Sequence, residues 1–192
     1  AAASTNNGVG VAGVCPNCSI MPVRVLSPWG GSASDVAKGI VWAADHGADV
    51  ISMSLGGDWP SATQEDAIEY AWQQGAIVIA AAGNQDTSRP HYPAYHDRCL
   101  AVGSTEQGDS RSSFSNYGNW VDVAAPGGYI MSSVPGNGYE YKSGTSMACP
   151  HVAGVAAMLY HDSMPSPDLM LIKGALVAGV DPVASMEGRT VS

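Results

Sequence analysis

Apolar residues follow two alternating patterns along the chain: short continuous runs, and longer stretches at helical spacing. Residues 77–82 form one of the continuous runs, which is typical of a strand with both faces covered. Residues 34–46 show the helical pattern, with Ser34 suited to an N-cap and Gly47 to a helix stop. We therefore expect strands at residues 20–26, 49–55, 77–82, 100–104 and 121–124. We expect helices at residues 34–46, 62–74, 145–160 and 166–176.

This order of elements predicts the fold class. Strands that alternate with helices favour an α/β fold, in which helices cover both faces of a mostly parallel central sheet. The 192 residues are enough for one hydrophobic core, and no repeat or low-complexity linker divides them. We therefore expect one domain over residues 1–192, with surface loops at 126–138, where proline and glycine are frequent.

The composition argues against several classes of partner. Hydrophobic residues make up 45% of the chain and charged residues 13%, which is typical of a closely packed fold. The net charge of −9 argues against binding to nucleic acid. The longest apolar stretches, residues 77–82 and 152–159, are too short to span a membrane. We expect neither nucleic acid nor a membrane as a partner.

The four cysteines leave several interpretations open. Cys15 and Cys18 could form a local disulfide, stay as free thiols, or act as half of a metal site or as a redox pair. A zinc site would need further ligands, and no second C-x-x-C or H-x-x-x-H motif is present. Cys149 lies three residues after Ser146, and its simplest interpretation is a small buried core residue.

Two polar residues at the ends of expected elements suggest acyl-transfer chemistry. Ser146 lies at the start of an expected helix, where free N–H groups and the helix dipole favour developing negative charge. Asn84 follows the buried run 77–82, and the carboxyl ends of parallel strands are where α/β sheets hold their sites. Ser146 would attack a carbonyl and Asn84 would stabilise the oxyanion. Taken alone, Asn84 reads more simply as a turn residue and Ser146 as an N-cap.

Six segments, in this order and spacing, resemble the subtilases, the subtilisin-like serine proteases, and most of all their thermitase branch. These segments are residues 6–13 (NNGVGVAG), 50–57 (VISMSLGG), 80–84 (AAAGN), 92–95 (YPAY), 113–118 (SFSNYG) and 144–154 (GTSMACPHVAG). The resemblance implies a three-layer subtilisin-like fold and a secreted, monomeric serine endopeptidase that acts on proteins or peptides.

The resemblance also assigns roles to residues. It makes Ser146 the nucleophile, and it makes Asn84 the oxyanion-hole side chain, with the backbone N–H of Ser146 completing the hole. The implied substrate-binding residues are Ser54, Leu55, Gly56, Ala81, Ala82, Gly83, Tyr92 and Pro93. The first three resemble an edge that pairs with substrate backbone, and the others line the S1 pocket. Because the walls 54–56 and 81–83 are small and uncharged, we expect large apolar or aromatic P1 side chains.

A structural calcium ion is a further implication of the resemblance. The family's calcium loop corresponds to residues 5–11, with oxygen ligands from Thr5, Asn7, Val9 and Val11. The family site also takes carboxylates from a more N-terminal part. The alternative interpretation is an Asn-Gly-rich turn that binds no ion.

The sequence departs from the family in its catalytic triad. The family's aspartate and histidine segments precede the nucleophile, and neither is found in the 192 residues, so we expect a catalytic domain truncated at the N-terminus and also clipped at the C-terminus. None of the five histidines is suited to replace the base: His46, His91, His96, His151 and His161. Two hypotheses remain, an incomplete serine endopeptidase and a non-catalytic descendant that binds extended peptides. An α/β-hydrolase is rejected because no histidine follows an aspartate after Ser146.

Overall fold

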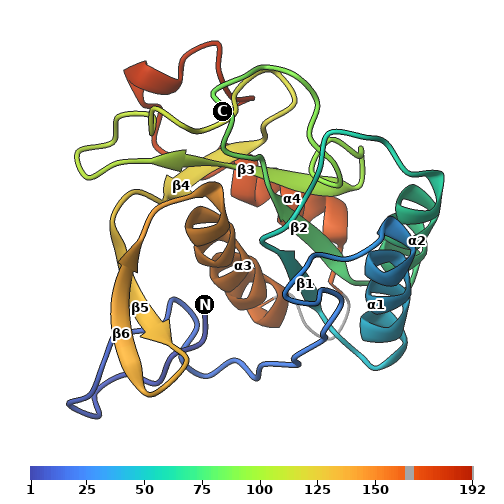
Figure 1. The fold of residues 1–192 in the computed structure, drawn as a ribbon, viewed down its shortest axis with the longest axis horizontal. Helices are drawn as coiled ribbons and strands as arrows, with labels where there is room; N and C mark the ends of the chain where they lie inside the picture. Colours follow the sequence, from blue (N-terminus) through green and yellow to red (C-terminus); the bar gives the residue numbers. More distant parts are fainter. Residues whose placement is uncertain (163–166, 192) are drawn as a thin grey trace.

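The computed structural model describes residues 1–162 and 167–191. Its centre is a parallel sheet of four strands in the order β1-β2-β3-β4, as Figure 1 shows. The strands are β1 (Val50–Met53), β2 (Ile77–Ala81), β3 (Cys99–Thr105) and β4 (Val123–Pro126). Every strand thus points its carboxyl end toward the same edge, where a site is expected.

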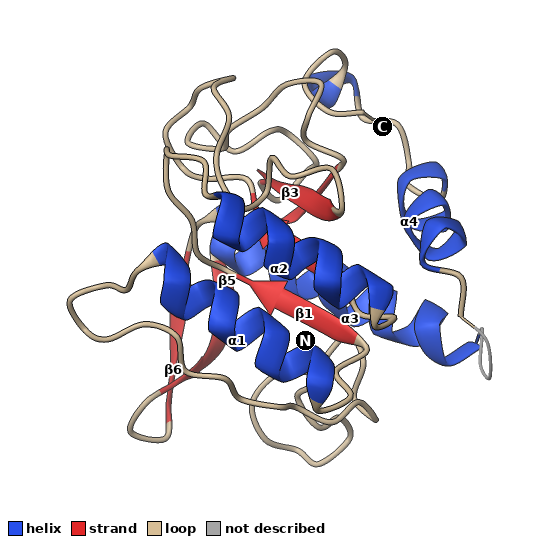
Figure 2. Ribbon diagram, turned by 90° about the vertical axis from the view of Figure 1, so that its right-hand side faces the viewer, coloured by secondary structure: helices blue, strands red, loops and turns tan. Residues whose placement is uncertain are grey.

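Helices cover both faces of this sheet. One face carries α1 (Ala33–Asp45) and α2 (Ala62–Gln73), which lie side by side over β1 in Figure 2. The other face carries α3 (Thr145–Asp162) and α4 (Leu169–Ala178), and a short 3₁₀ helix spans Ala184–Met186. The predicted α/β class with a parallel sheet and three layers is confirmed.

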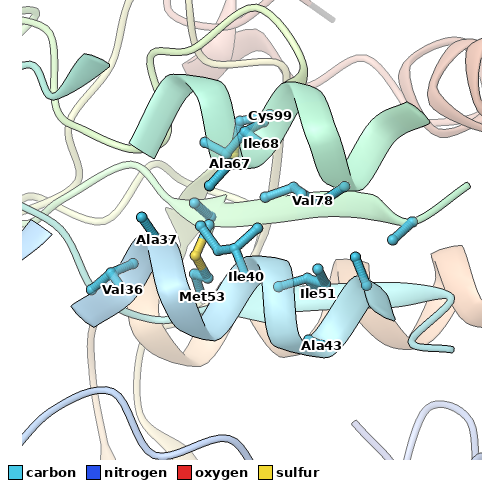
Figure 3. Packing of buried hydrophobic residues seen from close by; sticks show 14 of the residues in the cluster. Val36, Ala37, Ile40, Ala43, Ile51, Met53, Ala67, Ile68, Val78 and Cys99 are labelled. Carbon is cyan, nitrogen blue, oxygen red and sulfur yellow. The ribbon is translucent and has the colours of Figure 1, made fainter. Parts of the chain in front are cut away.

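The buried strand β2 shows why the sheet needs two layers of helices. Its side chains alternate between the faces, so Val78 and Ala80 pack with the α1–α2 layer while Ile77 and Ile79 pack with α3 and α4. Figure 3 shows Val78 among Ile40, Ile51 and Ile68 on the α1–α2 side. A continuous apolar run is therefore required here, because neither face of β2 meets water.

The predicted strand at residues 20–26 is wrong. This segment forms no strand, and a cleft of about 1310 Å³ lies between it and β1. A strand needs a hydrogen-bonded neighbour, and none of the described strands pairs with residues 20–26. Residues 20–26 have the apolar pattern of a strand, but they are not paired with any strand among the described residues.

Three other expectations need correction. The segment 126–138 is more than surface loop, because an antiparallel hairpin, β5 (Ile130–Val134) and β6 (Gly138–Lys142), begins within it. Helix α1 is capped by Ser32, whose Oγ accepts from the Asp35 N–H, instead of by Ser34. Helix α4 begins at Leu169 behind an Asp168 cap, and the start predicted at residue 166 lies outside the described residues.

Two of the four cysteines form a disulfide, and the other two are buried free thiols. Cys15 and Cys18 form a disulfide. Cys99 and Cys149 are free and buried, which confirms the core interpretation of Cys149. Burial raises the pKa of both thiols above the usual range, so the reactive thiolate is scarce at neutral pH.

A thiol titration checks this assignment. We expect the native chain to react negligibly with Ellman's reagent, and the chain unfolded in guanidinium to show two thiols. Addition of a reductant before unfolding should raise the count to four. Four thiols without reductant, or fast reaction of two in the native chain, would contradict the assignment.

No helix among the described residues is both long and apolar enough to cross a membrane.

Candidate active site

Ser146 sits in the first turn of α3, immediately after the Gly144 turn and Thr145. It is partly exposed, and its backbone N–H has no hydrogen-bond partner within the described residues. The first N–H groups of a helix have no partner inside the helix, so this donor is available to a ligand. Two hydrogen bonds tie the serine to the segment after β1: Ser146 Oγ donates to the Ser54 carbonyl (3.3 Å), and Ser54 Oγ donates to the Ser146 carbonyl (2.8 Å).

Asn84 reaches this helix start from the end of β2. Its Oδ1 accepts from the Thr145 N–H (2.8 Å) and from Thr145 Oγ1 (2.9 Å). A backbone N–H can only donate, so these bonds identify the amide oxygen and leave Nδ2 as the outward donor. In the described part of the chain Nδ2 has no partner of its own. Asn84 Nδ2 and the Ser146 N–H are therefore two free donors held beside one hydroxyl, which suits stabilisation of an oxyanion.

Gly83 allows the chain to turn from β2 into this contact. Its φ of +101° is strained for other residues, and a Cβ there would collide with Asn116 Nδ2 and lie 2.7 Å from Gln85 Oε1. The Gly83 N–H donates to Thr145 Oγ1 (3.1 Å). Gly83 and Asn84, which follow the end of β2, are thus both hydrogen-bonded to Thr145 at the start of α3.

Asn116 is a positioning residue that our sequence analysis did not single out. It is 1% exposed, its Nδ2 donates to the Ala82 carbonyl (2.8 Å), and its Oδ1 accepts from the N–H groups of Gln85 (3.0 Å) and Thr87 (3.3 Å). It therefore fixes the chain on both sides of Asn84. The signal was its place in the segment 113–118, which carries part of the family resemblance.

The predicted substrate-binding segments come together at the same edge. Gly57 and Tyr92 exchange two backbone hydrogen bonds of 2.8 Å, which joins the segment after β1 to the loop before Pro93. The bond between Tyr92 and Pro93 is cis. Ala81 and Ala82 are buried as whole residues. The Ala82 N–H donates to the Val102 carbonyl and the Ala82 carbonyl accepts from Asn116 Nδ2, so Ala82 has no free polar group for a substrate.

The histidines offer no general base to Ser146. Within residues 1–162 and 167–191, no hydrogen bond joins Ser146 Oγ to an imidazole. His46 and His151 contact carbonyls of their own helices through Nδ1, at 2.7 Å and 2.8 Å. Burial lowers the pKa of His91 and of His96, but neither is bonded to the serine.

The predicted calcium ligands, Thr5, Asn7, Val9 and Val11, lie in an open loop of bends. Asn7 Oδ1 accepts from the Val9 N–H (3.1 Å). Calcium takes six to eight oxygens, several of them carboxylate; residues 1–11 contain no acidic side chain, and no group of three or more His, Cys, Asp or Glu side chains is close enough to bind a metal in the described chain. These neutral oxygens suit calcium in kind but do not make a site, so calcium binding stays a prediction.

The paired donors beside a helix-start serine are an arrangement that suits acyl transfer, and the comparisons give the family of the chain. The subtilase family of S8 peptidases matches residues 1–177, so the chain belongs to the subtilases. It is 54% identical over 160 residues to thermitase from Thermoactinomyces vulgaris and to a thermophilic serine proteinase from a Bacillus species (strain AK1). Each alignment covers 83% of this chain, but 57% of the first relative and 40% of the second. The chain thus spans roughly half the length of these relatives.

Solved structures of proteases are also similar in fold to this chain. A protease from Pseudoalteromonas arctica matches with a TM-score of 0.93 and 37% identity, covering the whole of this chain and 65% of that one. A cold-adapted subtilisin-like serine proteinase matches with a TM-score of 0.85 and 41% identity, covering 93% of this chain and 67% of that one.

The Asn84–Thr145 contact can be tested in this chain through its stability. Asn84→Ala leaves the Thr145 N–H without its acceptor, and we expect a loss of about 1–2 kcal/mol in the free energy of unfolding. Asn84→Asp is the matched variant, because it keeps an acceptor for Thr145 beside a helix N-terminus and should lose less. Urea unfolding measures both, and an Ala variant as stable as the parent chain would contradict the contact.

Proposed function

We propose that residues 1–192 are part of one catalytic domain of a serine endopeptidase. Ser146 Oγ attacks the scissile carbonyl, and Asn84 Nδ2 and the Ser146 N–H donate to the oxygen as it becomes negative. The observation that carries this proposal is the fixed amide of Asn84, whose oxygen is bound to Thr145 and whose nitrogen is free.

The same proposal covers the binding of substrate. The segment 54–57 leads away from β1 along Ser146 and is held there by the Ser54 bonds and the Gly57–Tyr92 pairing. An extended peptide would lie against it as an added strand and place one carbonyl at Ser146. Proteins and peptides are therefore the proposed substrates, and the Cys15–Cys18 disulfide favours an oxidising compartment, as a secreted enzyme would meet.

Turnover requires a group that takes the proton from Ser146 Oγ. No described residue is placed to do so, and in subtilases this role belongs to histidine and aspartate segments that precede the nucleophile. We place the base and its carboxylate partner in such segments, outside the 192 residues. The second candidate function is that of a non-catalytic peptide-binding protein, and the observation in its favour is that none of the described residues is a base beside Ser146.

Labelling and turnover separate the two functions. We expect the 192-residue chain to show neither rapid labelling by a serine-directed fluorophosphonate nor turnover of a peptide substrate. When the aspartate and histidine segments of a subtilase relative are joined to it, both should appear, and Ser146→Ala should remove both.

The outcomes are distinct. A completed chain that folds and binds peptide, but neither labels nor turns over, supports the non-catalytic alternative. Turnover that survives Ser146→Ala contradicts the assigned nucleophile. Rapid labelling of the 192-residue chain would show that a base is already present.

A further inference from the structure

Arg111 is a largely buried cation that bonds to the turn carrying Asn84. Its side chain is 12% exposed, and it lies in the segment that leads from β3 toward Asn116. Its Nη2 donates to Asp86 Oδ1 (2.8 Å), and its Nη1 donates to the Ser115 carbonyl. Asp86 comes two residues after Asn84, and Ser115 directly precedes Asn116, which holds the same turn. One guanidinium thus ties the turn to the segment that anchors it.

Several contacts fix the place of this guanidinium. A guanidinium donates in a planar fork, so its two acceptors set the orientation of the whole group. The guanidinium carbon lies over the Tyr117 ring, 4.8 Å from the ring centroid. The backbone N–H of Arg111 donates to Ser185 Oγ (3.1 Å). Asp86 is therefore paired with a cation that is itself held in place by three other groups.

Asp86 depends on such a partner because its backbone is in the left-handed region. Its φ is +51°, which is uncommon for a residue other than glycine. Asn116 Oδ1 holds the backbone of Gln85 and Thr87 on either side, whereas the ion pair with Arg111 holds the Asp86 side chain itself. Without the pair, this residue can relax to another conformation, and the Asn84 amide moves with it. Small displacements of an aligned group are costly to a reaction rate.

We infer that Arg111 is a positioning residue, which acts through Asp86 to hold the Asn84 amide where the oxyanion forms. This inference rests on the proposed endopeptidase function. The role is indirect, because the side-chain contacts of Arg111 within the described residues are with Asp86, Ser115 and Tyr117 and not with Ser146. Our sequence analysis did not single out Arg111, since these contacts join segments that are distant in the chain.

A double-mutant cycle in the completed, active chain tests the inference. Arg111→Gln removes the ion pair, and we expect kcat to fall about tenfold with little change in KM, because the displaced donor acts chiefly in the transition state. In an Asn84→Leu background the same substitution should lower kcat by less than about twofold, because no donor is left to displace. Arg111→Lys keeps the charge without the planar fork and should recover part of the loss.

Arg98→Gln is the matched control. Arg98 Nε lies 3.2 Å from Glu69 Oε2, and its guanidinium carbon lies 5.0 Å from the Trp72 ring centroid, so it makes the same kinds of contact as Arg111. It directly precedes β3, at the edge of the sheet opposite to Asn84. We expect kcat to stay within about twofold of the parent value. Asp86→Asn, which removes the charge and tolerates a positive φ, replaces Arg111→Gln if that variant does not fold.

The result of the cycle separates the two proposals. An equal loss of kcat in both backgrounds, a folded Arg111→Gln variant with the parent kcat, or an equal loss from Arg98→Gln overturns the inference. In each of these cases the parent chain still turns over, so the endopeptidase proposal stands. If the completed parent chain folds but shows no turnover, the proposed function fails and the inference falls with it.

Discussion

The rest of the site depends on two hydrogen bonds that the Asn84 side chain accepts from Thr145. They join the segment just after the fully buried strand β2 to the first turn of helix α3, which lies about sixty residues later in the chain. Each bond contributes on the order of 1 kcal/mol to stability, yet their main effect is geometric. They leave the amide nitrogen of Asn84 free near the N–H of Ser146: a Cβ built on Gly144 would lie 3.5 Å from Asn84 Nδ2 and 3.6 Å from the Ser146 nitrogen. A pair of donors held on rigid elements needs no reorganisation when charge develops between them.

The same constraint explains the glycine at position 83. Gly83 must leave β2 at a positive φ, and its missing side chain leaves room for Asn116. Asn116 in turn holds the backbone of Gln85 and of Ala82, so the turn that carries Asn84 is anchored on both sides. On the neighbouring wall Gly56 allows the approach of His91. Close backbone packing therefore provides the alignment of the donors.

Much of this fold could be predicted because its elements carry local signals. The run 77–82 is apolar at every position since both faces of β2 are covered, and the helix expected at 62–74 is found as α2, Ala62–Gln73. The prediction of a strand at 20–26 was wrong because a strand needs a paired neighbour, and the apolar pattern of one segment does not reveal whether that neighbour is present. The hairpin of β5 and β6 was missed since its turn residues, Pro135 and Gly136, resemble those of a loop.

The candidate site was only partly predictable for the same reason. Ser146 and Asn84 could be found because each lies at the end of an element with a clear pattern and also in a segment that resembles the subtilases; the pattern alone favoured an N-cap and a turn residue. His91 could not be given its place, because its contact with Gly56 and Gly83 joins segments that are distant in the chain. The role of Asn116 likewise depends on tertiary hydrogen bonds to residues some thirty positions away.

The most direct test of the oxyanion hole is the turnover of Asn84→Leu in a chain completed with the family's aspartate and histidine segments. We expect a fall in kcat on the order of 10²–10³-fold with little change in KM, a loss of the size known for the corresponding donor in subtilisin. Such a split follows because Asn84 Nδ2 meets the oxygen chiefly when it carries charge. A variant that folds and retains the parent kcat would contradict the role of Asn84 as an oxyanion donor.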